Sequence, residues 1–149
     1  MKKQQLIIEH ELKCNSPNII WDLLSTDSGL TRWLADDVKQ QGDKLTFTWG
    51  EVWKHHEIRT ATIVKNIKLK CIRIKLDDEE GTDSYFELRL EKGHITNDYV
   101  LTIIDFAWED ELESIRTIWN DNLTRLRLTC GISLFVIQSE GLLFVWVKS

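Results

Sequence analysis

The segment that most constrains the fold is residues 15–37, NSPNIIWDLLSTDSGLTRWLADD, because it interrupts a chain that otherwise has the pattern of strands. Ser16 can cap a helix whose first residue is Pro17, since the proline ring fixes φ near its helical value and the missing N–H is not needed there. The apolar residues that follow have helical spacing and are Ile19, Ile20, Leu23 and Leu24. A second short helix is predicted to run to Trp33. A strand, two short helices, a run of strands and one long helix form a specific order of elements.

The remaining chain up to residue 106 is predicted to be mostly strand. The pattern of apolar and polar residues predicts strands over 6–14, 45–49, 52–64, 67–76 and 86–90. A further strand is predicted over 99–106, which is apolar on both faces apart from Thr102 and Asp105, as expected of a central strand or one covered on both sides. The segment 67–76 is irregular, since its apolar residues change from one face to the other at Ile72. We expect a β-bulge there, or a strand whose two ends bury opposite faces. The acidic run DDEEGTD at 77–83 predicts a solvated hairpin loop.

One long amphipathic helix is predicted over residues 109–130. Its apolar residues recur at steps of three or four and are Leu112, Ile115, Trp119, Leu123, Leu126 and Cys130. Gly131 is placed to end this helix as its C′ residue. Two apolar runs follow at 132–137 and 142–147, and the spacing between them predicts a hairpin. A hairpin this apolar must cover another surface or pair with one.

Length and charge limit the classes of function. A chain of 149 residues is predicted to be one domain, here residues 1–131, followed by an apolar C-terminal tail over 132–149. The net charge of −5 disfavours a nucleic-acid binder, because such proteins displace counterions with a basic surface. We therefore expect no nucleic-acid partner.

The lack of a recognisable signal peptide and the pattern of cysteines predict a cytoplasmic protein. The N-terminal sequence MKKQQLIIEHEL lacks the apolar core of a signal peptide, and the longest apolar run, 142–147, is too short to cross a bilayer. The three cysteines, Cys14, Cys71 and Cys130, are odd in number and form no CxxC pair. We expect them to be free, mostly buried thiols in a reducing compartment.

Several local motifs, taken in their order along the chain, resemble a known family. They are the SP–IIW–LLS–GL–RW–DD run, GDKLTFTW, the acidic hairpin before SYFELRL, and IDFAWEDE at the start of the long helix. The chain resembles START-like, helix-grip domains of the branch that contains activators of the heat-shock-protein-90 ATPase, and most of all a small bacterial START-like family. The resemblance covers about residues 4–131. It implies an α+β fold in which an antiparallel sheet of six or seven strands grips the long helix around a cavity.

A cavity between sheet and helix would be lined by inward-facing strand residues and by the stripe of the helix. The candidates for contact with a ligand are His10, Phe47, Trp49, Ile74, Phe86, Leu88, Trp119 and Leu123. Each of these positions also fits an ordinary core residue. Trp21 and Trp33 are expected to form an apolar wall at one end of the cavity. His10 is the polar member of the set, and it could orient a ligand or act as a general base, or simply hydrogen-bond to a neighbour within the core.

No constellation for metal binding or catalysis stands out, and no cofactor is expected. In His55-His56-Glu57, strand geometry lets His55 and Glu57 converge, but a third ligand is not evident nearby. The chain has no G-x-S-x-G nucleophile elbow and no glycine loop that would cradle phosphate. Asp105 is predicted to have a structural role, accepting hydrogen bonds from backbone N–H groups near the start of the long helix.

Three functions remain open from the sequence. The leading hypothesis is a non-enzymatic module that binds a hydrophobic or amphipathic small molecule, or a lipid, in its sheet–helix cavity. The second is a protein–protein interaction module, either similar to a co-chaperone or a homodimer formed through residues 132–149. The third, which the resemblance allows, is an enzyme of the cyclase or hydrolase type that uses His10. Fold alone does not decide among them.

Overall fold

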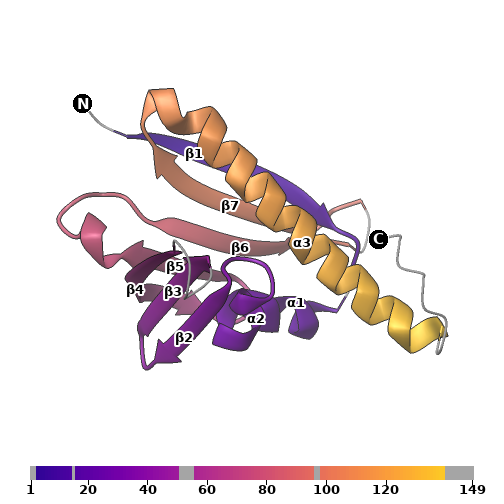
Figure 1. The fold of residues 1–149 in the computed structure, drawn as a ribbon. Helices are drawn as coiled ribbons and strands as arrows, with labels where there is room; N and C mark the ends of the chain where they lie inside the picture. The colour runs from indigo at the N-terminus through magenta and orange to yellow at the C-terminus, as the bar shows by residue number, and fades with distance from the viewer. Residues whose placement is uncertain (1–2, 15, 51–55, 96–97, 140–149) are drawn as a thin grey trace.

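The protein folds as one seven-stranded antiparallel sheet with a long helix across one face (Figure 1). The computed structural model describes residues 3–14, 16–50, 56–95 and 98–139. The strands are β1 (Gln4–Leu12), β2 (Asp37–Gln41), β3 (Lys44–Gly50), β4 (His56–Ile67), β5 (Cys71–Leu76), β6 (Phe86–Lys92) and β7 (Tyr99–Ala107). The helices are α1 (Pro17–Ser25), α2 (Asp27–Thr31) and α3 (Leu112–Ser139), with short 3-10 turns η1 (Asp77–Glu79) and η2 (Glu109–Glu111). This is the predicted α+β helix-grip architecture.

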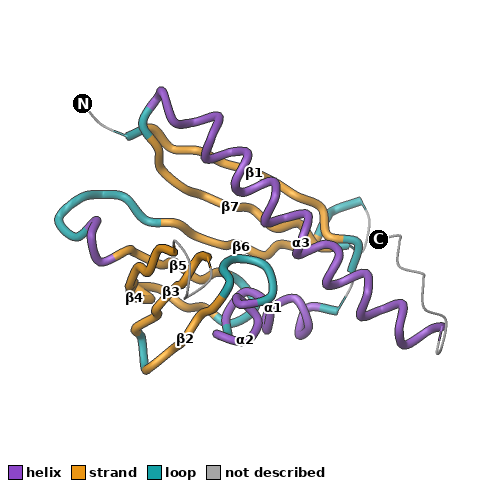
Figure 2. Tube along the Cα trace, in the orientation of Figure 1, coloured by secondary structure: helices purple, strands orange, loops and turns teal. Residues whose placement is uncertain are grey.

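The strand order is β1-β7-β6-β5-β4-β3-β2, so β1 and β2 are the two edge strands. They are consecutive strands of the chain, and the helices α1 and α2 connect them. Figure 2 shows these helices beside β2, and the long loop between β5 and β6 at the opposite end of the sheet. The helical pair predicted from the sequence therefore carries the chain from one edge of the sheet to the other.

Close packing between α1 and α2 depends on Gly29. A Cβ atom at this position would lie 2.0 Å from the carbonyl oxygen of Asp22. The N-terminus of α2 is capped by Thr26, whose Oγ1 accepts a hydrogen bond from the N–H of Gly29 at 2.9 Å. Ser16 occupies the predicted N-cap of α1, but its side chain makes no capping hydrogen bond. The start of α1 rests instead on Pro17 at its first position.

The predicted strand over 67–76 is wrong, because the chain reverses direction within it. Strand β4 ends at Ile67, a turn follows, and β5 begins at Cys71. Leu69 takes a positive φ of 63° in this turn and packs against the core. The change of apolar face seen in the sequence therefore marks a tight turn. A register irregularity does occur, but it lies in β4 between Ile63 and Lys65.

Strand β2 was not predicted, since DVKQQ contains a single apolar residue. Val38 is 4% exposed and faces the core, while the residues after it are exposed. An edge strand of this kind gains its structure from pairing with its neighbour, here Val38 opposite Phe47 of β3. The predicted start of the following strand, at residues 52–55, lies outside the described residues.

Helix α3 is longer than predicted at its C-terminal end. It runs to Ser139, so Gly131 does not end it and the apolar run 132–137 is helical instead of forming a strand. One glycine costs a helix about 1 kcal/mol, which is too little to stop it when the residues that follow can continue the helix. The second apolar run, 142–147, lies outside the described residues.

The core lies between α3 and the sheet face that carries Leu12, Phe47, Ile72, Leu88 and Leu101, all of which are fully buried. The predicted apolar stripe of α3 is confirmed, with Trp119, Leu123, Leu126 and Cys130 buried and Leu112 and Ile115 half-buried. The three cysteines are free and buried, as predicted. Burial raises the pKa of the Cys130 thiol to about 12.

The opposite face of the sheet contains a buried carboxylate. Glu87 is 0% exposed because Arg73 and Arg89 cover it, and the Nε atom of Arg73 lies 2.6 Å from its Oε1. Arg89 donates to the other carboxylate oxygen. The guanidinium of Arg73 also stacks over the ring of Tyr85, with 4.1 Å between its Cζ and the ring centroid. Two arginines and one carboxylate thus form a compact ion-pair cluster on this face.

Candidate ligand groove between the sheet and helix α3

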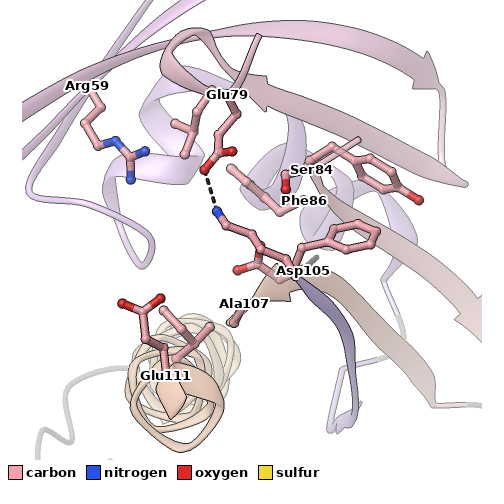
Figure 3. A pocket seen from close by; sticks show the side chains of 12 residues that line it. Arg59, Glu79, Ser84, Phe86, Asp105, Ala107 and Glu111 are labelled. Atoms are coloured by element: carbon pink, nitrogen blue, oxygen red, sulfur yellow. Dashed lines mark hydrogen bonds and ion pairs between the residues drawn. The ribbon is translucent and has the colours of Figure 1, made fainter. Parts of the chain in front are cut away.

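Two adjoining cavities open between the sheet and the first turns of α3. Their volumes are about 310 Å³ and about 300 Å³. They share five lining residues, Arg59, Leu76, Phe86, Asp105 and Ile115. We call the combined space the sheet–helix groove, and Figure 3 shows the part nearer to the end of β7.

One wall of the groove is apolar and rich in aromatic rings. Its apolar side chains come from α3, from strands β3, β5 and β6, and from the chain after α2; they are Leu34, Trp49, Leu76, Phe86, Ile115, Ile118 and Trp119. The ring centroids of Phe86 and Trp119 lie 5.7 Å apart. Trp49 is held by its indole Nε1, which donates to the carbonyl oxygen of Leu34 at 3.0 Å. The tilted contact between Phe86 and Trp119 and the hydrogen bond of Trp49 therefore hold these rings in the wall of the groove.

Asp105 is one of two charged residues in the described ranges that line both cavities, the other being Arg59. Its Oδ2 accepts a hydrogen bond from Nε1 of Trp119 at 2.8 Å, and its Oδ1 accepts one from the N–H of Phe106, also at 2.8 Å. The backbone bond agrees with the structural role expected for this residue. Burial raises the pKa of the Asp105 carboxyl, against the opposing effect of these two hydrogen bonds. Asp105 thus joins β7 to α3 and also presents a carboxyl to the groove.

Two ion pairs border the groove at its outer end. Lys3, just before β1, lies 2.6 Å from the Oε1 of Glu79 in η1, and Figure 3 shows this pair as a dashed line across the cavity. Arg59 of β4 lies in both cavities, and its Nη2 contacts both carboxylate oxygens of Asp78, at 2.8 Å and 2.9 Å. Both basic side chains of the groove are therefore already paired with carboxylates.

The structure brings three of the predicted ligand-contact residues to the groove, namely Trp49, Phe86 and Trp119. The others, apart from His10, are packed in the core and do not line it; they are Trp21, Trp33, Phe47, Ile74, Leu88 and Leu123. Trp33 lies directly behind the groove, with its ring centroid 6.4 Å from that of Trp119. Its indole Nε1 donates to the carbonyl oxygen of Leu23 at 2.8 Å. The segment just after the helical pair contributes to the groove through Leu34.

His10 does not line the groove. It pairs with Leu101 across β1 and β7, four residues along β1 from Leu6, which is the partner of Asp105. Its Nε2 atom is buried and makes no hydrogen bond within the described part of the chain. Burial lowers the pKa of His10, and the charge of Arg127 lowers it further. Both effects favour the uncharged form of His10, which lies on the core-facing side of β1 within reach of the charge of Arg127 in α3.

Sequence reasoning missed Arg59 and Glu57 as groove residues. Ile58 has the apolar character of an inward residue, yet it is 57% exposed. The signal that could have found the groove residues is the alternation further along β4, where Ala61 and Ile63 are buried. Counting back from them in steps of two assigns Arg59 and Glu57 to the inner face.

Metal binding and membrane insertion gain no support from the described residues. Within them, no group of three or more His, Cys, Asp or Glu side chains is arranged to hold a metal ion. His55, one of the histidines considered as a ligand, lies outside these ranges. None of the described helices is both long and apolar enough to cross a membrane.

A curved antiparallel sheet that grips one long helix, with a ligand-sized groove between them, defines the helix-grip class of proteins. The model of the START-like superfamily domain matches residues 1–132, and the chain belongs to this superfamily. The expected resemblance is therefore confirmed. Comparison with curated proteins finds no match.

Solved structures of similar fold extend this assignment. A solution NMR structure of a Bacteroides fragilis protein is 37% identical, covers 87% of this chain and 93% of its own, and has a TM-score of 0.61. The Aha1 dimer from Colwellia psychrerythraea is 20% identical, with coverages of 83% and 93% and a TM-score of 0.67. CalU16 from Micromonospora echinospora is 18% identical, with coverages of 93% and 83% and a TM-score of 0.66. The last two similarities concern the fold alone.

Proposed function

We propose that the protein is a non-enzymatic binding protein that holds a hydrophobic or amphipathic small molecule in the sheet–helix groove. The observation that carries this proposal is the groove itself, about 300 Å³ in each half and walled by Trp49, Phe86 and Trp119. The half of the groove with the aromatic wall has the size and the mostly apolar lining of ligand sites, and the other half supplies polar and charged groups. The START-like superfamily commonly binds hydrophobic ligands, which agrees with this function. The buried free thiols fit the cytoplasmic location predicted from the sequence.

A variant that fills the groove tests the proposal. Ile115 lines both cavities, so Ile115→Trp should place an indole in the space that a ligand would occupy. Leu128→Trp adds the same side chain at an exposed position of α3 outside the groove and serves as the matched control. We expect the neutral fluorophore N-phenyl-1-naphthylamine to bind the natural protein and Leu128→Trp, and to lose most of its binding to Ile115→Trp.

Native mass spectrometry of the freshly purified protein gives an independent measurement. A co-purifying small molecule that is present in Leu128→Trp and missing from Ile115→Trp would support the groove as its site. Equal fluorophore binding by all three proteins, or no bound molecule together with no thermal shift across a panel of lipids, would contradict the proposal.

A second candidate function is self-association through residues 132–149. The apolar composition of this segment favours it, as does the dimeric state in which the Colwellia Aha1 structure was solved. Deleting residues 132–149 should then lower the sedimentation mass from dimer to monomer. A monomer both before and after the deletion would contradict this role.

The catalytic alternative is not favoured, because His10 lies outside the groove. A general base must be within hydrogen-bonding reach of the proton that it abstracts. A ligand bound beside Trp49, Phe86 and Trp119 would not meet that condition. Substituting His10→Phe is therefore expected to leave fluorophore binding unchanged.

A further inference from the structure

The charged groups of the groove are unbalanced in favour of carboxylates. Among the described residues that line it, the basic ones are Lys3 and Arg59, and the acidic ones are Glu57, Glu79, Asp105 and Glu111. Figure 3 shows Asp105 near the end of β7 and Glu111 in η2, just before α3, both facing the same space. An aromatic groove with excess negative charge selects among amphipathic ligands by the sign of their polar group.

Both basic side chains of the groove are already paired with carboxylates, so they are less available to a ligand than the unpaired carboxylates are. Glu79 holds Lys3, and Asp78 holds Arg59 through two carboxylate oxygens. An anionic ligand would have to displace one of these carboxylates to reach a cation. Within the described part of the chain, Glu57, Asp105 and Glu111 have no basic partner at ion-pair distance. Among the described residues, a cationic ligand would meet these three carboxyl groups without displacing a basic side chain from any of them.

Asp105 gives the strongest reason to expect a cation. Burial without a basic partner disfavours its charged form, so a positive group next to it would relieve an existing cost. The charge of Lys3 lowers the pKa of Asp105 and that of Glu79 raises it, so Glu79 offsets part of the compensation that Lys3 provides. The hydrogen bonds from Trp119 and Phe106 occupy one direction at each oxygen, and a carboxylate oxygen can accept more than one.

The aromatic wall adds a second attraction at the same place. Because Nε1 of Trp119 donates to Asp105 in the plane of the indole, the carboxyl lies at the edge of this ring, and a cation bound to it meets a ring face only where it lies to one side of the indole plane or against Phe86. Ammonium groups are attracted to the faces of aromatic rings, and most strongly to tryptophan. The remaining walls, formed by Leu34, Leu76 and Ile115, suit a flat apolar body.

We propose that the groove binds amphipathic amines, with the ammonium group at Asp105 and an apolar, preferably aromatic, body against Trp49, Phe86 and Trp119. This inference rests on the proposed binding function and specifies its ligand class. The ammonium group replaces water in donating hydrogen bonds to the carboxylate, and the apolar body displaces water from the rings.

Three probes with the same apolar body test the sign of the preferred charge. At pH 7, 1-naphthylmethylamine is cationic, 1-naphthylmethanol is neutral and 1-naphthylacetate is anionic. Isothermal titration of the full chain should give a Kd for the amine about tenfold lower than that for the alcohol, with the acetate binding most weakly. Replacing Asp105→Asn should remove most of the preference for the amine and leave the alcohol affinity within about twofold.

Two further variants separate local recognition from net charge. Glu9→Gln removes one negative charge from an exposed position of β1 outside the groove, so it should leave the affinity for the amine unchanged. Glu111→Gln alters an exposed carboxyl in the groove and should weaken amine binding several-fold, which provides a test even if Asp105→Asn fails to fold.

The outcomes distinguish this inference from the function on which it rests. If the alcohol or the acetate binds as tightly as the amine, the groove is a binding site but the inferred ligand class is wrong. If Glu9→Gln weakens amine binding as much as Asp105→Asn does, the attraction comes from net charge, and the proposed contact at Asp105 is also wrong. If none of the three probes binds, both the inference and the proposed function fail.

Discussion

At the scale of single residues, two carboxylates in opposite environments give the clearest consequences. Asp105 is half-buried, with two hydrogen-bond donors and no ion-pair partner among the described residues, and its pKa is raised. Burial would also raise the pKa of Glu87, but the hydrogen bonds and charges of Arg89 and Arg73 outweigh it, so that its pKa is lowered. The two side chains should therefore change protein stability in opposite directions as the pH falls.

The Asp105 carboxyl is predicted to weaken the folded state as it ionises. A raised folded-state pKa contributes stability that is fully present below the unfolded value of about 3.8 and is lost as the pH rises through the folded value. Replacing Asp105→Asn removes this dependence. The free energy of unfolding of the natural protein, relative to that of the variant, should fall between pH 4 and pH 7 in urea titrations. A difference that stays constant with pH would contradict the burial effect.

Glu87→Gln should destabilise the protein by about 1–2 kcal/mol at pH 7, because two arginines lose their charged partner in a buried position. The difference in stability between the natural protein and the variant should shrink below about pH 4.5, because the natural carboxylate becomes protonated and loses its ion pairs with Arg73 and Arg89. Urea unfolding at several pH values measures both effects. Glu91→Gln, at an exposed position of the same strand, is the control and should change stability by less than about 0.5 kcal/mol.

At the scale of elements, the sequence correctly predicted the helices and strands whose apolar residues have a clear helical or strand spacing. Residues 17–31 form the expected pair of helices, and α3 buries the expected stripe. The missed element, β2, has little pattern of its own and depends on pairing with β3. The turn at 68–70 was mistaken for a continuous strand, because Leu69 is an apolar residue at a position with positive φ, where glycine or asparagine is usual.

The contact between α1 and α2 should not tolerate a side chain at Gly29. Gly29→Ala would place Cβ against the backbone of Asp22 and Leu23, at 2.0 Å and 2.7 Å, so the two helices would have to separate. We expect a loss of about 2–3 kcal/mol in the free energy of unfolding. The neighbouring exposed variant Ser28→Ala should lose less than about 1 kcal/mol. Similar stability of the two variants in thermal unfolding would rule out close packing at Gly29.

Because α3 continues through Gly131, replacing this glycine by alanine is predicted to stabilise the protein, in contrast to Gly29→Ala. Alanine is favoured over glycine inside a helix by about 1 kcal/mol, so Gly131→Ala should raise both the helical circular dichroism signal and the melting temperature. If Gly131 were instead the C′ residue of a shorter helix, alanine would be strained there and the variant would be less stable. The sign of the change in melting temperature separates the two structures.

At the scale of the whole molecule, the sequence predicted which candidate residues face the helix side of the sheet. It did not predict which of them line the groove and which are packed in the core. Phe47 and Trp49 face inward from the same strand and stack with centroids 5.5 Å apart, yet only Trp49 reaches the groove. Phe86 and Leu88 differ in the same way on β6. Alternation along a strand assigns a face, but the height at which α3 crosses the sheet decides whether a residue meets the helix or open space. That height depends on packing across the whole domain.

The order of the strands also has a consequence for how the protein is made. The edge strand β1 pairs with β7, and its first residue, Gln4, lies opposite Ala107. Of the described strands, β1 leaves the ribosome first, and β7, with which it pairs, is the last of them to be made. Contacts this distant in the chain slow folding, and an unpaired strand edge is a site of aggregation. We therefore expect the nascent chain to depend most on chaperones in the interval before β7 emerges.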